Sequence, residues 1–580
     1  MIRRFFRWLL RAIVTLVIIF VLMLVSDYIQ HRVETGSVLV VTLKGPVVER
    51  ATPGLLGLAS QRETPLTTLR SAIDRAAEDP RIAGLAIKVI DPDMELGQAQ
   101  EIIGLVKGFR KHGKWACAYI ETAGEFSSGN LPYIVAASTG DVSIMPDGEL
   151  NVVGVGIREV FARGTLDWIG IRPNFGAFGK YKSAGNIFTE KDFTPAQREE
   201  DESLIGSMYD QIVAAISSER GLGTDKIHEL INQAPLSAGD GLKAKLVDRI
   251  EYEDQFTDRM KNQGGTKHAM VDFTDYARPR MLSSWGVKDR IAVIYCDGEI
   301  QRGEGEGVGL TGTEVVTSDD LSDAFDKARE DESVRAIIFR INSPGGSALG
   351  SELIRRAAEL TSDKKPIVVS MSGYAASGGY WVSTPAAKMI AEPGTITGSI
   401  GVLGGKFNVE PATKKIHLNS GAITRGDNVE MFDEFADFTP DQMKIFQDRM
   451  LGDTYQHFLR IVAKSRHMSV EDVDAIAQGR VWTGEQALTV KLVDTLGGFE
   501  TALGEARKLA KLTPEQKVTF MELPPRPGLL SRILGSQATS AVIRMPATMR
   551  AIAAPLAIIR AALERGGAIG AAYCPVRPVL

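Results

Sequence analysis

Residues 367–381 read IVVSMSGYAASGGYW, and this stretch decides how the whole sequence is interpreted. The β-branched residues at its start predict a buried strand, and the small residues that follow predict a sharp turn at Ser377, directly before Gly378 and Gly379. Such a turn exposes one hydroxyl and bare backbone N–H groups, as a serine nucleophile requires. The alternative is a tight strand-to-helix connection in which Ser377 only caps the helix.

The composition excludes several classes of protein. A chain of 580 residues predicts two or more domains, and 44% hydrophobic with 24% charged residues is ordinary for a globular protein. The net charge of −5 and the absence of interleaved arginine and aromatic residues argue against a nucleic-acid partner. Neither CxxC nor HExxH occurs, so we expect no metal and no cofactor. The sequence does not exclude a Ser-His-Asp triad, because the three residues of a triad need to be close only in the folded structure.

The N-terminus predicts a membrane anchor. Residues 1–25 read MIRRFFRWLLRAIVTLVIIFVLMLV, in which four arginines precede an apolar run close to the roughly 20 residues that span a bilayer. The arginines place this end in the cytoplasm. The run is also short enough for a signal-peptide core, but no A-x-A-like cleavage site follows it. We therefore expect an uncleaved helix within residues 1–29, with the rest of the chain in a bacterial periplasm.

Two tetrapeptides occur twice and indicate an internal duplication. DFTP stands at 192–195 and 437–440, and KLVD stands at 245–248 and 491–494, with offsets of 245 and 246 residues (437 − 192 and 491 − 245). Identical tetrapeptides in the same order at nearly the same offset predict two copies of one domain.

We expect the copies to span residues 30–275 and 276–512. Within each, short apolar runs such as 336–341, 366–371 and 388–391 alternate with helical patterns, which predicts an α/β fold of βαβ units around a mainly parallel sheet. Long helices are expected over 195–220 and 440–466, after the N-caps Thr194 and Thr439. The tail, 513–580, is expected to be either helical, chiefly over 541–565, or a poorly ordered extension.

Three glycine-rich turns follow successive predicted strands of the second copy. They are NSPGGS at 342–347, AASGG at 375–379 and TGSIG at 397–401. Loops after parallel strands gather at one sheet edge, where α/β proteins place their sites. The N–H groups of Gly346 and Gly378 are the candidate oxyanion donors, because glycine presents its backbone without a Cβ.

These motifs, RINSPGGS at 340–347, AASGGYW at 375–381, TGSIG at 397–401 and GKYKSA at 179–184, resemble the signal peptide peptidases of the SppA type in their long, duplicated form, peptidase family S49. The resemblance covers residues 38–512 and leaves out the tail. One departure is Gly185-Asn186, where an acidic or apolar residue followed by proline is expected. The resemblance implies two tandem Clp protease/crotonase-like domains and a membrane-bound serine protease with a Ser/Lys dyad.

The resemblance also implies the site residues. Ser377 matches the nucleophile, Lys182 the general base, and Ser399 the residue that hydrogen-bonds and orients this lysine, while Gly346 and Gly378 match the oxyanion hole. A lysine is protonated at neutral pH unless burial lowers its pKa. The aromatic residues near Lys182 in sequence that suggest such burial are Phe175, Phe178, Tyr181 and Phe188. Lys180 is the rival base, and only the family pattern separates the two lysines.

The two copies differ at these positions. Copy one has DPDM at 91–94 where copy two has SPGG, and it has GEFSSGN at 124–130 near the place of Ser377. At an offset of 245, Lys182 corresponds to Asp427. We infer that one copy keeps the base and the other the nucleophile, and that Lys182 and Ser377 meet across a domain interface.

The sequence thus predicts an inner-membrane, single-pass serine endopeptidase whose periplasmic part degrades cleaved signal peptides. Its partners are apolar peptide substrates, the membrane through the N-terminal helix, and further copies of itself, since the resemblance implies a homotetramer. Two alternatives remain: a crotonase-like acyl-CoA enzyme, and a non-catalytic membrane scaffold.

Overall fold

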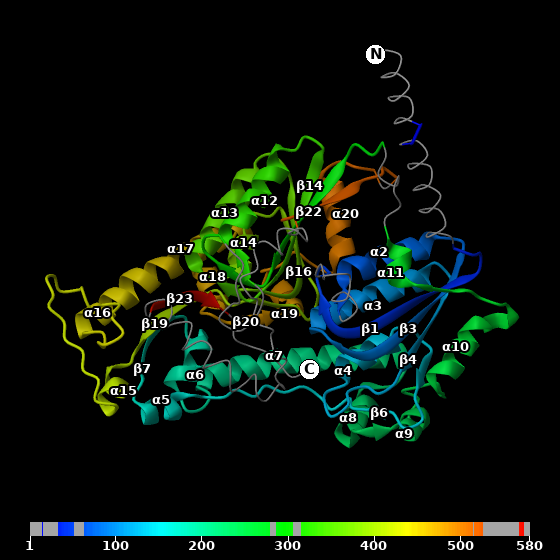
Figure 1. The fold of residues 1–580 in the computed structure, drawn as a ribbon, viewed down its shortest axis with the longest axis horizontal. Coiled ribbons are helices and arrows are strands. Elements are labelled where there is room, and N and C mark those ends of the chain that lie inside the picture. Colours follow the sequence, from blue (N-terminus) through cyan, green and yellow to red (C-terminus); the bar gives the residue numbers. More distant parts are fainter. Residues whose placement is uncertain are drawn as a thin grey trace, which may run out of the picture. The chain divides into compact units, whose positions relative to one another are not determined.

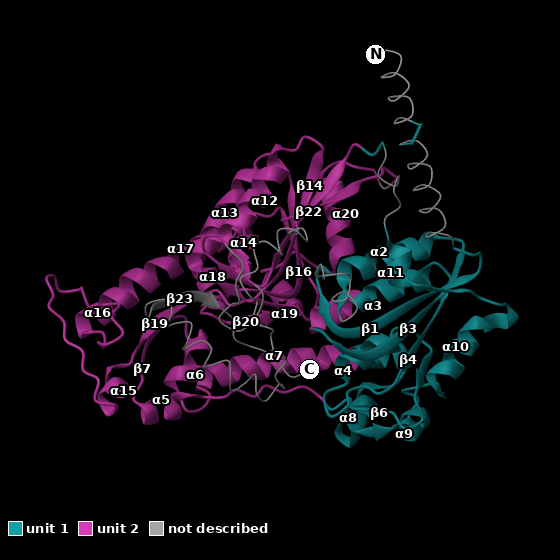
Figure 2. Ribbon diagram, in the orientation of Figure 1, with its two compact units in different colours: residues 1–94, 102–153, 215–287 teal, residues 95–101, 154–214, 288–580 magenta. Residues whose placement is uncertain are grey.

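The computed structural model describes residues 14–15, 33–51, 63–278, 286–304, 315–513, 515–525 and 568–573 (Figure 1). They fall into two compact units, coloured separately in Figure 2. Unit 1 comprises 1–94, 102–153 and 215–287, and unit 2 comprises 95–101, 154–214 and 288–580. The units divide the chain differently from the predicted copies, because unit 2 includes 154–214. The boundaries expected from the duplication, 30–275 and 276–512, stay a prediction.

Unit 1 is built on a parallel sheet. Its strand order is β10-β1-β3-β4-β5-β9, and every neighbouring pair is parallel. The strands are β1 (Ser37–Val48), β3 (Ile82–Asp93), β4 (Trp115–Ile120), β5 (Val142–Ile144), β9 (Arg249–Ile250) and β10 (Met270–Asp272). The short β2 (Thr64–Pro65) pairs with β1 outside this path.

Unit 2 repeats the arrangement as β22-β11-β14-β16-β17-β21, again with every pair parallel. The strands are β11 (Arg290–Asp297), β14 (Val334–Ser343), β16 (Ile367–Ala376), β17 (Lys388–Ala391), β21 (Thr495–Leu496) and β22 (Thr519–Leu523). β18 (Ile396–Gly398) also pairs with β16, and β20 (Val481–Thr483) runs antiparallel to β18. The mainly parallel α/β fold and the three strands predicted at 336–341, 366–371 and 388–391 are confirmed.

Equivalent contacts stabilise the two sheets, which supports the duplication. Arg220 pairs with Asp248 in unit 1 and Arg466 with Asp494 in unit 2, both at 2.9 Å and both 28 residues apart. The hydroxyl of Tyr133 donates to the carbonyl of Leu246, and that of Tyr380 to the carbonyl of Leu492, both at 2.7 Å.

Helices cover both faces of the unit 2 sheet. α12 (Ser318–Glu330), α13 (Ala348–Ser362), α14 (Gly378–Ser383) and α17 (Gly452–Arg466) share one apolar core with the sheet, and α20 (Phe499–Leu509) shares another (Figure 1). Consecutive residues of a strand pack into the cores on opposite faces of the sheet: Ile337 and Phe339 belong to the first core and Ile338 to the second. A sheet buried on both faces explains why its strands are continuously apolar.

The long helices begin where the sequence predicts. α7 (Pro195–Arg220) follows Thr194, whose hydroxyl accepts the N–H of Gln197 at 3.2 Å. α16 (Pro440–Ile445) follows Thr439, which forms a capping box with Gln442. The helix then continues through a π-helical turn, Phe446–Leu451, into α17.

A second, six-stranded sheet of unit 2 has the order β13-β12-β15-β23-β19-β7. Its strands are β7 (Arg172–Phe178), β12 (Glu299–Gln301), β13 (Val315–Thr317), β15 (Gly345–Gly346), β19 (Val402–Asn408) and β23 (Ala568–Tyr573). The tail therefore supplies two strands, β22 and β23. The expectation of a helical or disordered tail is wrong for these segments, while residues 541–565 lie outside the described part of the chain.

The predicted membrane anchor also lies largely outside the described residues, since only 14–15 of residues 1–29 are described. In the part of the chain that is described, no helix is both long and apolar enough to cross a bilayer.

A buried ion pair connects the unit 2 sheet to the first turns of α3 (Leu96–Lys111). Arg340, on β14, is completely buried, and its Nη2 lies 2.6 Å from Oε2 of Glu101. Its guanidinium also donates to the hydroxyls of Ser370 and Ser372 on β16, both at 2.9 Å. Burial and the neighbouring Glu101 raise the pKa of Glu392 to about 8, so this second carboxyl stays protonated at neutral pH. The guanidinium charge is thus compensated mainly by one carboxylate.

We predict that Glu101→Ala destabilises the protein by about 3–5 kcal/mol, because it leaves the Arg340 charge buried without its counter-ion. Urea unfolding of the full chain measures this free energy. Arg356→Ala is the control, since it removes an exposed ion pair with Glu359 and its expected cost is at most about 1 kcal/mol. Equal stabilities of the two variants would contradict the prediction.

Candidate active site

Ser377 lies in a strained turn between β16 and α14. Its φ of 55° and ψ of −112° are unusual for a residue with a side chain, and such a conformation costs on the order of 1–3 kcal/mol. The turn is held by its backbone: the N–H of Ser377 donates to Gly398, and its carbonyl accepts from Trp381, both at 2.8 Å. The Ser377 hydroxyl makes no capping bond to α14, so the interpretation of this residue as a simple helix cap is wrong.

Lys182 meets this serine inside unit 2. Its Nζ lies 2.8 Å from Oγ of Ser377, 2.9 Å from Oγ of Ser399 and 3.0 Å from the carbonyl oxygen of Ser399. Lys182 is 4% exposed and Ser377 is completely buried. Lys180, by contrast, is exposed and lies over the ring of Tyr181. The structure therefore brings Lys182, and not Lys180, to the serine. Both residues belong to compact unit 2, so they do not meet across an interface between the compact units, as the sequence analysis inferred.

The backbone around Lys182 is tightly packed, which fixes where the amine lies. The N–H of Tyr181 donates to the carbonyl of Gln478 at 2.8 Å, and that of Lys182 to Gly179 at 3.0 Å. Gly479 has a φ of 82°, and a Cβ built on it would lie only 2.5 Å from the nitrogen of Lys182. A side chain at position 479 would therefore displace the lysine.

The phenylalanines that lie near Lys182 in the sequence stack on other aromatic rings. Phe175 stacks on Phe188 with ring centroids 5.6 Å apart, and Phe178 stacks on Tyr455 at 5.5 Å. The direct neighbours of Lys182 in the chain, Tyr181 and Ser183, are themselves buried.

Ser399 holds the lysine from the other side. It follows β18 with a φ of 51°, and its N–H donates to the carbonyl of Arg480 at 2.7 Å. In this conformation both its hydroxyl and its carbonyl reach the amine. The position agrees with the predicted orienting role, which stays a prediction.

The two glycines predicted to form the oxyanion hole lie side by side. Gly346, on β15, has a φ of 149°, and a Cβ there would lie 2.1 Å from the carbonyl oxygen of Ile300. A Cβ on Gly378 would lie 3.1 Å from the backbone nitrogen of Gly346 and 2.6 Å from Oγ of Ser351. Only glycine fits at either position. Their action as donors stays a prediction, because it depends on a bound substrate.

A buried carboxyl near the lysine is not singled out by the sequence. Glu200, on α7, is 1% exposed; its Oε1 accepts the N–H of Val481 at 2.5 Å, and its Oε2 has no hydrogen-bond partner among the described residues. Burial raises the pKa of Glu200 to about 8, although the N–H of Val481 and the charge of Lys182 act in the opposite direction. Burial likewise raises the pKa of the adjacent Asp201 to about 7. In sequence Glu200 belongs to the charged run REEDE (198–202), which is typical of a solvated helix face.

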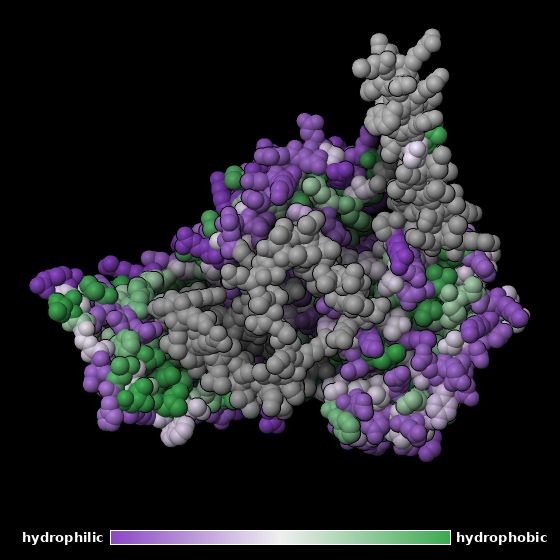
Figure 3. Space-filling view, viewed as in Figure 1, coloured by the Kyte–Doolittle hydropathy of each residue, from purple (hydrophilic) through white to green (hydrophobic). Residues whose placement is uncertain are grey.

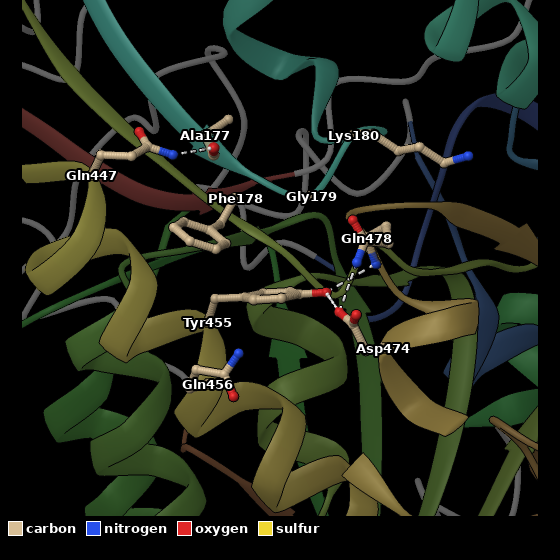
Figure 4. Close-up of a pocket in the computed structure, with 9 residues that line it drawn as sticks. All are labelled: Ala177, Phe178, Gly179, Lys180, Gln447, Tyr455, Gln456, Asp474 and Gln478. Atoms are coloured by element: carbon tan, nitrogen blue, oxygen red, sulfur yellow. Dashed lines mark hydrogen bonds between the residues drawn. The ribbon is translucent and has the colours of Figure 1, made fainter. Parts of the chain in front are cut away.

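A cavity of about 410 Å³ opens beside the segment that leads to Lys182. Figure 4 shows the rings of Phe178 and Tyr455 on one side and Gln478 and Asp474 on another. The hydroxyl of Tyr455 donates to Asp474 at 2.5 Å, and the N–H of Gln478 donates to that hydroxyl at 3.2 Å. Because the carbonyl of Gln478 holds Tyr181, this polar network supports the segment that carries the lysine.

A buried amine within hydrogen-bond distance of a serine hydroxyl, at the edge of a parallel α/β sheet, is typical of serine-type hydrolases that use lysine as the base. The model of peptidase family S49 matches residues 109–267 and 359–513, once in each half of the chain. The chain belongs to this family and is a serine-type peptidase.

Relatives of the chain carry matching names. The chloroplastic serine protease SPPA of Arabidopsis thaliana is 30% identical over 538 residues, which are 92% of this chain and 77% of that protein. Protease 4 of Salmonella typhi is 30% identical over 596 residues, covering 95% and 93%. A putative signal peptide peptidase SppA of Enterococcus faecium is 32% identical over 195 residues, covering 33% and 56%. The matches along most of the chain confirm the long, duplicated form.

The carboxyl of Glu200 predicts a pH-dependent stability. Its folded-state pKa of about 8 lies above its ordinary 4.5, so it stabilises the fold fully below pH 4.5 and loses this contribution as the pH rises towards 8. Glu200→Gln keeps an acceptor for Val481 and removes the titration. We expect it to gain up to about 4 kcal/mol relative to wild type between pH 5 and pH 9.

Urea unfolding at the two pH values measures this gain. The control is Glu202→Gln, which alters an exposed carboxyl on the same helix and should follow the wild type. If the Glu200→Gln and wild-type stabilities change in parallel with pH, the carboxyl does not titrate as described.

Proposed function

We propose that the protein is a serine endopeptidase that degrades cleaved signal peptides, with Ser377 as nucleophile and Lys182 as general base. The observation that carries the proposal is the distance of 2.8 Å between Nζ of Lys182 and Oγ of Ser377, both buried. Removal from water disfavours an ammonium ion, and Lys182 must be a neutral amine to accept the serine proton. The name of the Enterococcus faecium relative supports signal peptides as the substrate class.

The geometry supports a two-step hydrolysis. Oγ of Ser377 attacks the scissile carbonyl carbon while its proton passes to Nζ of Lys182, and the N–H groups of Gly346 and Gly378 stabilise the oxyanion. The lysine then gives this proton to the leaving amine, and the C–N bond breaks. A water molecule, deprotonated by the same amine, then attacks the acyl carbon. The ester bond to Oγ of Ser377 breaks, and Lys182 gives the proton to Oγ. Ser399 keeps Nζ directed at the serine throughout.

We further propose that the enzyme is anchored in a bacterial inner membrane by a single N-terminal helix, with the catalytic part in the periplasm. The support is the sequence of residues 1–25, in which arginines precede the apolar run. This location would place the site where cleaved signal peptides leave the membrane.

We also propose that the protein forms an oligomer, which the family resemblance implies to be a homotetramer. An apolar surface supports it: exposed large apolar residues gather around α15 (Glu410–Lys415) and α5 (Arg163–Ile169), at the lower left of Figure 3. They are Trp168, Ile416, Leu418, Ile423, Val429 and Phe432. A surface of this kind is typical of protein–protein contact.

The dyad predicts that Ser377→Ala and Lys182→Ala each lower kcat/KM for a fluorogenic peptide by at least about 1,000-fold, since each removes a partner of the proton transfer. Both variants should keep the wild-type circular dichroism spectrum. Lys180→Ala is the matched control and should retain activity. A serine-directed fluorophosphonate should label the wild type and not Ser377→Ala. Full activity of Lys182→Ala would refute the dyad, and an unlabelled, inactive wild type would favour the scaffold.

The apolar surface predicts an effect on assembly. Ile423→Asp, at a residue that is 97% exposed, should lower the particle mass of the detergent-solubilised protein, because a charge at an apolar contact opposes association. Multi-angle light scattering measures the mass. Arg425→Asp is a charge-changing control two residues away. A wild type that is already monomeric, or an unchanged mass of the Ile423→Asp protein, would contradict the proposal.

A further inference from the structure

Glu200 contacts the end of the turn that leads into β20, residues 478–480, which we call the β20 turn. Oε1 of Glu200 accepts the N–H of Val481, the first residue of β20, at 2.5 Å. Glu200 lies on the buried face of α7 with Gln197 and Leu204, which are three residues before it and four residues after it. The carboxyl is therefore held inside the protein, against the backbone that follows the turn.

The β20 turn contacts both the segment of the lysine and Ser399. The carbonyl of Gln478 accepts the N–H of Tyr181 at 2.8 Å, and the carbonyl of Arg480 accepts the N–H of Ser399 at 2.7 Å. Gly479, between them, leaves no room for a side chain beside the lysine. Gln478 has a φ of 53°, a conformation that persists only where surrounding contacts hold it. A displaced turn would therefore move the amine and Ser399 together.

Few charged groups act on Glu200. Burial is the largest influence and raises the pKa of Glu200 to about 8. The charge of Asp201, which itself lies near Glu159, acts in the same direction. The charges of Lys182 and Arg480 act in the opposite direction. At neutral pH Glu200 is therefore a neutral carboxyl close to the base.

A neutral carboxyl and a carboxylate have different effects on a neighbouring lysine. A carboxylate stabilises the ammonium ion and raises the pKa of the lysine, whereas a neutral carboxyl does not. Arg480 has a counter-ion of its own, because its Nη1 lies 3.0 Å from Oε1 of Glu199. Lys182 is thus the cation that an ionised Glu200 would stabilise.

We propose that Glu200 is a positioning residue of the dyad: its carboxyl holds the β20 turn against Lys182 and Ser399, and in its neutral form it leaves the lysine uncharged. The proposal rests on the proposed peptidase function for the role of Lys182 as the base. Ionisation of Glu200 stabilises the ammonium form of the lysine and moves the onset of activity to higher pH. The carboxyl thus has two separable effects, one on the geometry of the site and one on the charge of the base.

Glu200→Gln separates these effects, because an amide keeps an acceptor for Val481 and cannot ionise. We expect the pH at which kcat/KM for a fluorogenic peptide is half-maximal to fall by at least about half a unit, a roughly threefold gain on the acid side. The maximal kcat should be unchanged. Glu202→Gln, at an exposed position of the same helix, is the control and should follow the wild type. An unchanged pH profile of Glu200→Gln would overturn the proposal.

Glu200→Ala removes the acceptor as well as the charge. We expect it to lower the maximal kcat at least about tenfold, because a base that moves away from the serine loses the geometry needed for proton transfer. Circular dichroism checks that the variant is folded, and the pH profile of Glu200→Gln tests the proposal if it is not. An alanine variant that is folded and as active as the wild type would overturn the positioning role.

A stability measurement tests the contact between Glu200 and Lys182 without any hydrolysis. Urea unfolding at pH 9 compares the wild type, Glu200→Gln, Lys182→Met and the double variant. We expect non-additive free energies, because the carboxylate and the ammonium ion stabilise each other. Additive free energies would refute the role of Glu200, whatever the activity of the wild type. Non-additive free energies in a wild type that hydrolyses no peptide would refute the peptidase function alone.

Discussion

The site depends on one constraint, which is the burial of a primary amine among serine oxygens. Nζ of Lys182 has oxygen atoms of Ser377 and Ser399 within 3.0 Å, and the side chain is almost entirely removed from water. A buried ammonium ion would be costly, and a buried neutral amine needs hydrogen-bond partners. The two serines supply these partners, and Ser377 lies where its hydroxyl proton can pass to the amine lone pair in the proposed reaction. The stability of the buried lysine and its proposed chemistry thus have the same cause.

This constraint explains the unusual backbone around the site. Ser377 and Ser399 both have positive φ, and Gly479 leaves no room for a side chain beside Lys182. Such conformations persist only where surrounding contacts hold them. The bonds from Ser377 to Gly398 and from Ser399 to Arg480 are these contacts, and all of them lie within compact unit 2. The segment 154–214, from the first half of the chain, clusters with the second half and brings Lys182 to Ser377. In the first copy Asn130 begins the helix that corresponds to α14, 247 residues before Ser377, so that copy has no nucleophile at this position.

Local periodicity was enough to predict most of the sheet and the long helices of unit 2. The strands β14, β16 and β17 contain continuous apolar runs. Thr194 and Thr439 are the N-caps at which α7 and α16 begin. The site residues needed the family resemblance, because nothing local distinguishes Lys180 from Lys182; the difference is burial. Glu200 and the Arg340–Glu101 pair were not predicted, because the burial of an ionisable side chain depends on elements that are distant in the sequence. β23 was missed for a related reason: the small residues of AIGAAY have no strand pattern of their own, and their conformation follows from the two edges beside them.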